Sequence, residues 1–247
     1  MRAFRNNRVF SILAFASVSL PFLLGHASAG TYDDLYFIGF SKDGRYLAFE
    51  TYGTGDCSGY GYSVITFVNT EKNDWASNPI STVIDDETRT VQETRQEARG
   101  VNKKKAFNQI SNLGIVDGNV GAHVVSRLLT DLTTFSGPIR FAKEIGSMYQ
   151  HGDYELTLKE MVANSKECSV SDEPKIFELI LKNKETNKTK VLQKDRTIPR
   201  SRRCANSYQI SDVFIYNNYI AVFLNMFTPP RYEGPDMRYL VVTGTLE

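Results

Sequence analysis

Two histidines are the residues of this chain best suited to acid–base chemistry, and neither lies in a catalytic motif. A serine or cysteine nucleophile needs a neighbouring base, usually histidine. His26 belongs to a leader segment described below, which leaves His123 and His151. The chain has no Gly-x-Ser-x-Gly turn. His151 precedes a Gly-Asp pair typical of a solvated turn, and His123 lies among alanine and valine, which is typical of a half-buried residue. These features argue against catalysis, and a hydrolase that uses His123 or His151 with an unidentified partner is kept as the alternative function.

The acidic and glycine-rich clusters predict neither a metal ion nor a nucleotide. The acidic run 85–87 (Asp-Asp-Glu) lacks the alternating ligands and the glycine of a calcium loop, so we expect a solvated loop or a helix start. The glycine-rich loop 53–61 leads into a β-rich run. A phosphate loop would have to open a helix, so nucleotide binding is rejected. We expect no metal and no cofactor.

Aromatic and charged residues gather in two loops, 51–61 and 225–237, and form the best candidate binding patch. Tyrosine and arginine are favoured at binding surfaces because they supply rigid amphipathic area. The predicted ligand or partner site consists of Tyr60, Arg231, Tyr232, Glu233 and Asp236. This prediction requires both loops to lie at a common edge. The alternative is that these are aromatic residues at strand ends, covering the core.

The first 29 residues have the features of a secretory signal peptide. Three arginines and no acidic residue precede an apolar run that Pro21 interrupts, and Ala-Ser-Ala then stands before Gly30. We expect cleavage between Ala29 and Gly30. An uncleaved membrane anchor is the alternative, although the apolar run is marginal for a full span.

Removal of this segment leaves a nearly neutral chain. The remainder has 26 basic and 28 acidic residues because three of the 29 basic residues and none of the 28 acidic ones lie in the leader. This balance gives no electrostatic footprint for nucleic acid. With 41% hydrophobic and 12% aromatic residues, the composition is that of an ordinary globular protein. We expect an exported bacterial protein, periplasmic or secreted, with no stable membrane span after cleavage.

Export favours a disulfide among the three cysteines, because disulfides persist outside the cytoplasm. Cys168 and Cys204 each lie in a polar, loop-like stretch flanking a predicted hairpin, and Cys57 is far away in the glycine-rich loop. We predict a Cys168–Cys204 disulfide with Cys57 unpaired; three free thiols are the alternative. The chain has no Cys-x-x-Cys pair, which excludes a thioredoxin-type site.

Two similar β-rich units lie near the ends of the chain. Each has a tight turn between two apolar runs, with Asp43-Gly44 in the first and Asn217-Asn218 in the second. At an offset of 173 residues the sequence Tyr-Leu-Ala-Phe of the first lies over Tyr-Ile-Ala-Val of the second. A repeat of this kind indicates a propeller or array, and convergence of two ordinary meanders is the alternative. The expected strands are 35–40, 45–50, 62–68, 208–215, 219–224 and 238–243.

The middle of the chain predicts one helix and further strands. Apolar residues at helical spacing in a charged stretch without proline predict a helix over about 92–112. Residues 115–150 are ambiguous, since Val124, Leu128 and Leu132 suit a helix and 139–142 suits a strand. Strands are expected at 153–163, 175–183 and 188–194. The fold class is mainly β (α+β), a single domain of about nine to eleven strands in a propeller-like or two-sheet arrangement, covering 30–247.

These residues carry two resemblances. The segment 40–49, Phe-Ser-Lys-Asp-Gly-Arg-Tyr-Leu-Ala-Phe, resembles the FSPDGxxLAF blade signature of periplasmic TolB-type β-propellers, with Lys42 in place of proline. Over nearly all of the chain after the leader, the motifs resemble a predicted secreted protein family, domain of unknown function 2259. They include 38–50, Asp74-Trp75, 199–204, 208–210 and 233–239, and Cys57 stands where that pattern has glycine. The resemblance implies export and a β-rich domain, and no mechanism.

The leading functional hypothesis is a non-enzymatic periplasmic or secreted binding module. It follows from the export signal, the β-rich architecture, the lack of a recognisable catalytic set and the polar-aromatic loops. The expected partner is an envelope protein or a polar, sugar-like ligand.

Overall fold

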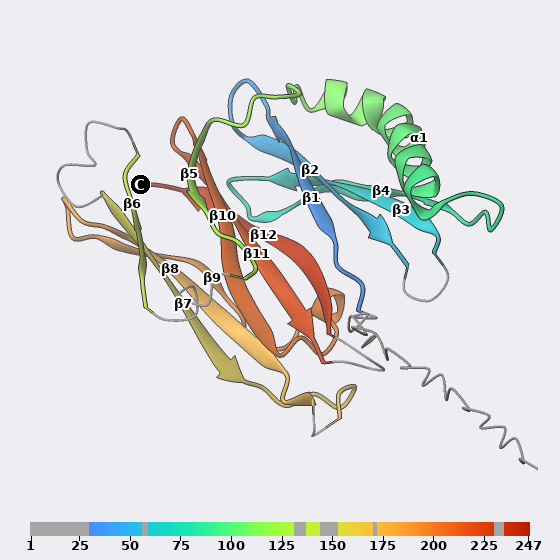
Figure 1. The fold of residues 1–247 in the computed structure, drawn as a ribbon. Helices are drawn as coiled ribbons and strands as arrows, with labels where there is room; N and C mark the ends of the chain where they lie inside the picture. The colour runs from blue at the N-terminus through green and yellow to red at the C-terminus, as the bar shows by residue number, and fades with distance from the viewer. Residues whose placement is uncertain (1–29, 56–58, 131–136, 144–152, 170–171, 230–234) are drawn as a thin grey trace, which may run out of the picture.

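The computed structural model describes residues 30–55, 59–130, 137–143, 153–169, 172–229 and 235–247. Within them, twelve strands form three four-stranded antiparallel sheets, and one long helix accompanies them (Figure 1). The mainly β fold class is thereby confirmed, with one strand more than the upper end of the expected range. The predicted leader 1–29, Cys57 and His151 lie outside the described residues.

The first sheet is a meander of four consecutive strands in the order β1-β2-β3-β4. The turn between the first two strands contains Gly44 at φ 79°, a left-handed conformation that glycine adopts without steric cost. A Cβ on Gly44 would also lie 2.5 Å from the Tyr219 ring, so this turn packs directly on the second sheet. The strands are β1 (Asp34–Phe40), β2 (Tyr46–Thr54), β3 (Gly61–Asn69) and β4 (Asp74–Ile84).

Helix α1 (Val91–Asn112) covers the outer face of the first sheet and confirms the predicted helix. Its start is fixed by a capping box, in which Thr90 and Glu93 exchange side-chain to backbone hydrogen bonds. The buried face of the helix is a narrow stripe of small and polar residues at four-residue spacing: Thr94, Ala98, Asn102 and Ala106. Small side chains allow the helix to lie close to β3.

The second sheet combines the C-terminal unit with one strand from the middle of the chain, in the order β12-β11-β10-β5. Both terminal units carry a β-bulge: Ile38 is the extra residue in β1 and Ser211 the extra residue in β10. These residues are 173 positions apart, so the offset seen in the sequence also relates the two bulges. The strands are β5 (Ala122–Ser126), β10 (Ser207–Tyr216), β11 (Tyr219–Thr228) and β12 (Asp236–Thr245).

The third sheet is again a meander, in the order β6-β7-β8-β9. Its strands confirm the predicted segments and are β6 (Ile139–Phe141), β7 (Tyr154–Val162), β8 (Lys175–Asn183) and β9 (Thr189–Lys194). The sulfur atoms of Cys168 and Cys204 lie 2.16 Å apart, so the predicted disulfide joins the loop between β7 and β8 to the segment that leads into β10.

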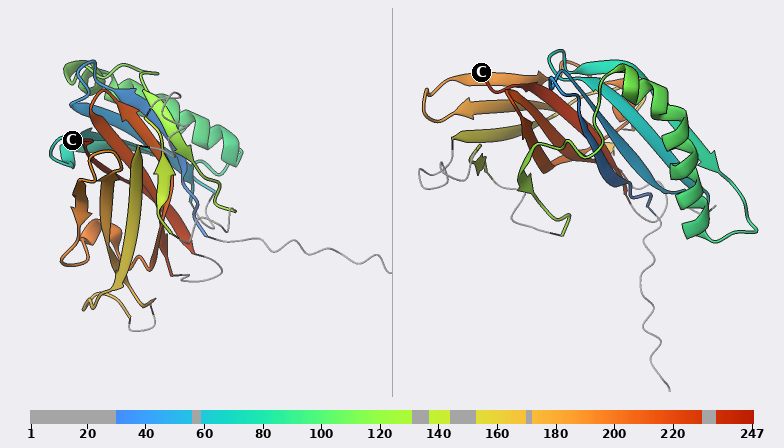
Figure 2. Two further views of the ribbon diagram at one scale, coloured as in Figure 1. Left: turned by 90° about the vertical axis from the view of Figure 1, so that its left-hand side faces the viewer. Right: turned by 90° about the horizontal axis from the view of Figure 1, so that it is seen from above.

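The elements stack as helix, first sheet, second sheet and third sheet (Figure 2, right). Isoleucines and alanines around Phe67 fill the first interface. A phenylalanine cluster fills the second and includes Phe37, Phe49, Phe214 and Phe223. Aliphatic residues of β7 and β8 pack on β10 and β11 in the third. Phe37 of the first sheet faces the second sheet, and Ile210, 173 positions later, faces the third sheet from the second. Equivalent positions of the two terminal units therefore face the next sheet in the stack.

Two segments differ from the sequence prediction. Val124 lies in β5, which pairs with the edge of β10, so the helical alternative left open for this residue is wrong. Leu128 beyond it is exposed, and Leu132 lies outside the described residues. The strand β4 was not predicted because Pro79 and several polar residues interrupt the alternating pattern. It is an edge strand with two register irregularities, where proline is tolerated.

Candidate ligand-binding cleft

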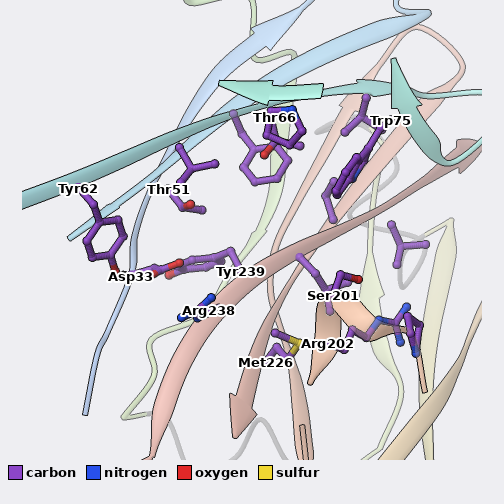
Figure 3. A pocket seen from close by; sticks show the side chains of 18 of the residues that line it. Asp33, Thr51, Tyr62, Thr66, Trp75, Ser201, Arg202, Met226, Arg238 and Tyr239 are labelled. Atoms are coloured by element: carbon purple, nitrogen blue, oxygen red, sulfur yellow. Dashed lines mark hydrogen bonds between the residues drawn. The ribbon is translucent and has the colours of Figure 1, made fainter. Parts of the chain in front are cut away.

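A cleft of about 720 Å³ follows the outer edge of β12 (Figure 3). Five consecutive residues of β12, from Arg238 to Val242, line it. One wall is the inner face of the first sheet, with Thr51, Thr66 and Trp75 among its residues; the other holds Gln193 of β9 and the short 3-10 helix η4 (Arg200–Arg202). The edge of the second sheet therefore forms the floor between the first and third sheets.

Each end of the cleft is closed by hydrogen bonds to β12. At one end, Met237 N donates to Thr31 O (2.9 Å) and Asp33 N donates to Met237 O (3.0 Å). At the other end, Thr243 N donates to Asn73 Oδ1 (2.8 Å), while Asn73 Nδ2 donates to Gln193 Oε1 (2.8 Å). These contacts hold the three sheets together around the cleft.

The end of the cleft near Asp33 contains a buried carboxyl group. Asp33 is 8% exposed, and the Tyr62 hydroxyl donates a hydrogen bond to its Oδ1. Burial raises the pKa of Asp33 to about 6, an effect that the Tyr62 hydrogen bond and the positive charge of Arg238 oppose. Burial also raises the pKa of Tyr62, and the neighbouring Asp33 charge adds to this. In Figure 3 the Tyr62 hydroxyl points toward Asp33, with Arg238 beside it.

The two walls differ in chemistry. Trp75, 58% exposed, stands on the first-sheet wall. On the opposite wall, Arg202 forms an ion pair with Asp195 and stacks on the Phe177 ring at 4.3 Å. Because the Arg202 charge already has a buried partner, Arg238 is the more available cation of the cleft. The remaining lining mixes polar residues such as Thr51 and Thr66 with apolar ones, which include Val64, Val68, Met226 and Leu240.

Only part of the predicted binding patch can be placed. Tyr60 lines the cleft, with its ring centroid 6.4 Å from that of Tyr62. Asp236, at the start of β12, accepts a hydrogen bond from Thr31 N (3.0 Å) at the same end. Both of these predicted residues thus lie close to the segment 31–33. Arg231, Tyr232 and Glu233 lie outside the described residues.

The scan against protein families gives one match, to the family described as "Predicted secreted protein (DUF2259)", over residues 48–245. The match covers well over half of the chain. The chain belongs to the DUF2259 family. The search of curated proteins found no match. The matched region contains β12 and both walls of the cleft, whereas Asp33 precedes it.

The family description agrees with the export predicted from the leader of this DUF2259 protein. Among the described residues, no helix combines the length and apolar character needed to cross a membrane. The residues that the structure describes contain no cluster of three or more His, Cys, Asp or Glu side chains that could hold a metal ion. The acidic run 85–87 lies in the loop before α1, where Asp86 accepts hydrogen bonds from Thr88.

Several cleft residues of this DUF2259 protein were not found by sequence reasoning. Asp33 and Asn73 are polar residues next to strand ends, and their positions become meaningful only once the sheets stack. Trp75 offered a signal, because it is the only tryptophan and stands in a polar stretch. Tyr52 of the aromatic loop lies on the opposite face, where the Arg99 guanidinium stacks on its ring at 3.7 Å.

His123 lies in β5, away from the cleft. Its Nε2 is 2.8 Å from Asp212 Oδ1, and its ring stacks on Phe214 with centroids 4.2 Å apart. A histidine oriented by a carboxylate is one component of an acid–base site. The histidine side chain is 40% exposed, so solvent reaches the pair.

Proposed function

We propose that this DUF2259 protein is an exported binding module, periplasmic or secreted, that holds a ligand in the cleft along β12. The observation that carries the proposal is the mixed lining of the cleft, where apolar side chains such as Val64 and Met226 stand beside polar groups, among them Asp33 and Arg238. Such a lining suits a binding site, because apolar area supplies affinity and polar groups fix the orientation of the ligand.

The aromatic residues restrict the class of ligand. Trp75 presents an exposed ring to the cleft, and Tyr60 and Tyr62 lie at the end near Asp33. Rings of this kind contact apolar side chains or the flat face of a sugar, with Arg238 available for a polar group. An envelope protein segment and a sugar-like ligand are therefore the two classes to test.

Trp75 gives a direct test, since it is the only tryptophan in the chain. Peptide and oligosaccharide collections would be screened by the change in its fluorescence, and hits confirmed by calorimetry. We expect Trp75→Ala to weaken binding of a hit at least tenfold. Phe107→Ala, which removes a 69% exposed ring on α1, is the matched control and should bind normally. A library without hits, or equal loss in both variants, would contradict the proposal.

A second candidate is a hydrolase that uses His123, favoured by the 2.8 Å contact of this residue with Asp212. The test is an activity screen on exported protein, with His123→Ala and His151→Ala as variants. Loss of a measured activity in either variant, with unchanged thermal stability, would support the enzyme. Activity that survives both substitutions would argue against it.

A further inference from the structure

The backbone of β12 directs its polar groups outward at every second residue. In the antiparallel ladder with β11, Met237 pairs with Phe227 and Thr243 with Ala221. Met237 and Thr243 use their outward amides to bind Thr31 O and Asn73 Oδ1, so their N–H groups point away from β11. Antiparallel ladders alternate in this respect. The N–H and C=O groups of Tyr239 and Val241, which lie between them at two-residue steps, therefore also point to the outer edge.

The outer edge already accepts a backbone segment at one end. Tyr32 forms a parallel bridge with Met237, and the two hydrogen bonds of that bridge run from Met237 N to Thr31 O and from Asp33 N to Met237 O. At the other end, the side-chain oxygen of Asn73 takes the place that a strand carbonyl would occupy opposite Thr243. The geometry of strand addition is therefore present on both sides of the open stretch.

The stretch between these ends is open to the cleft. Within the described residues, no hydrogen bond engages the outward N–H or C=O groups of Tyr239 and Val241. Exposed sheet edges are usually protected by charges, proline or a covering segment, because unpaired edges recruit other strands. Here the sequence between Arg238 and Thr243 is Tyr-Leu-Val-Val, and it faces a cleft rather than a covering element.

Resting on the proposed binding function, we propose that the ligand of the cleft is an extended peptide segment of another protein, which adds to the outer edge of β12 by hydrogen bonding to Tyr239 and Val241. Strand addition supplies affinity through the backbone and specificity through side chains that alternate between the two walls. From Met237 to Thr243 the edge spans roughly 20 Å, which accommodates a peptide of about five residues.

The walls define the side chains that such a peptide carries. Val64, Val68 and Trp75 face it from the first sheet, whereas the opposite wall holds Gln193, Ser201 and Arg202. The Arg202 charge is already neutralised by Asp195. The peptide is therefore apolar or aromatic at the positions that face the first sheet and polar at the positions between them, with at most one acidic residue near Arg238.

The first experiment uses a displayed library of random seven-residue peptides, selected on the full protein. The tightest peptide would be synthesised with a single N-methyl group at each position in turn, which removes one amide hydrogen at a time. In strand addition only alternate amides bind the edge. We expect about tenfold weaker binding at alternate positions and smaller effects at the positions between them. A flat N-methyl profile would overturn the inference, as would a library in which no peptide is enriched.

The second experiment removes the donor from the protein. Val241→Pro deletes an amide that points outward and leaves the ladder with β11 intact, whereas Val241→Ala keeps the amide and is the matched control. We expect the selected peptide to bind Val241→Ala and to bind Val241→Pro at least tenfold more weakly. Equal binding to both variants would overturn the inference. If Val241→Pro does not fold, the N-methyl profile measured on the unaltered protein still tests whether the peptide adds to β12 as a strand.

The two proposals can fail separately. An oligosaccharide that binds in a Trp75-dependent manner, together with no selected peptide, would leave the binding function standing and overturn the peptide inference. Absence of both kinds of ligand would overturn both proposals.

Discussion

The Tyr62 hydroxyl donates a hydrogen bond to Asp33 Oδ1, and this bond joins the first sheet to the segment that pairs with the edge of β12. The carboxyl group lies at one end of the cleft and is almost completely buried. A buried acid favours its neutral form, which is why the pKa of Asp33 is raised from 3.8 to about 6. The contact therefore links the pH of the medium to the stability of this junction.

The first prediction concerns this carboxyl group. Because its pKa is higher in the folded protein than in the unfolded chain, the folded state binds the proton more tightly. The contribution of Asp33 to stability is therefore greatest below pH 4 and is lost as the pH rises through about 6. Relative to the original protein, Asp33→Asn should gain stability as the pH rises from 3.5 to 7, and it should be more stable by about 2 kcal/mol at pH 7. Urea unfolding at pH 3.5 and pH 7 measures both quantities. A variant that is less stable than the original at pH 7 would contradict the prediction.

The second prediction concerns the ion pair between Glu50 and Arg99 beneath the helix. The Glu50 side chain is 7% exposed and is held by Arg99 at 2.9 Å and by Ser63 Oγ at 2.8 Å. Arg99→Ala leaves a buried carboxylate without its cation and should cost about 3 kcal/mol of unfolding free energy. Denaturant unfolding measures the loss.

Arg95 is the matched control for Arg99, because both extend from α1. Its ion pair with Asp34 at 3.2 Å is exposed, with 37% and 55% of the two side chains accessible. Exposed pairs contribute little, so Arg95→Ala should change the stability by less than about 1 kcal/mol. Equal losses of unfolding free energy in the two variants would contradict the prediction, because they would mean that burial of Glu50 does not strengthen its ion pair with Arg99.

The sequence predicted the elements better than the site. Local signals sufficed for the hairpins, since Gly44 and Asn217 both adopt positive φ at the turns, and for the helix with its capping box at Thr90. The strand β4 escaped detection because Pro79 interrupts its pattern. Residues 122–126 form a strand because the edge of β10 is available for pairing, which no local signal reports.

The cleft depends on tertiary structure. Its floor comes from β12, one wall from β2, β3 and β4, and the other from β9 and η4, which lie far apart in the chain. Asp33, Asn73 and Arg202 acquire their roles only when three sheets stack. Tyr60 and Asp236 were found because tyrosine and carboxylate residues at strand ends are informative without knowledge of the packing.

The third prediction concerns the disulfide between Cys168 and Cys204, which are 36 positions apart. A cross-link of this length restricts the unfolded chain, so replacing both cysteines by serine should cost about 3–4 kcal/mol. Thermal unfolding of the double variant measures the effect. Peptide mapping of unreduced protein should link these two cysteines and leave Cys57 unlinked. A linked Cys57 would contradict the pairing.

The last prediction compares two glycines that the fold uses differently. A Cβ on Gly61, at the start of β3, would lie 2.2 Å from Arg95 N and 2.3 Å from the carbonyl carbon of Thr94, so the helix would have to move. We expect Gly61→Ala to cost about 2–3 kcal/mol. A Cβ on Gly100, inside the helix, meets nothing within 4 Å. Gly100→Ala should therefore stabilise the protein by about 1 kcal/mol, because alanine favours the helix.

The comparison also tests how the helix layer and the cleft are coupled. Gly61 directly precedes Tyr62, so displacement of β3 by the alanine should disturb the hydrogen bond from Tyr62 to Asp33. Loss of that bond removes an interaction that lowers the pKa of Asp33, and the fall in stability with rising pH should then become steeper. Gly100→Ala should leave the pH dependence unchanged. Unfolding curves for both variants at pH 4 and pH 7 measure this. Opposite changes in stability, with a steeper pH dependence for Gly61→Ala alone, would show that close packing of β3 on α1 positions the end of the cleft.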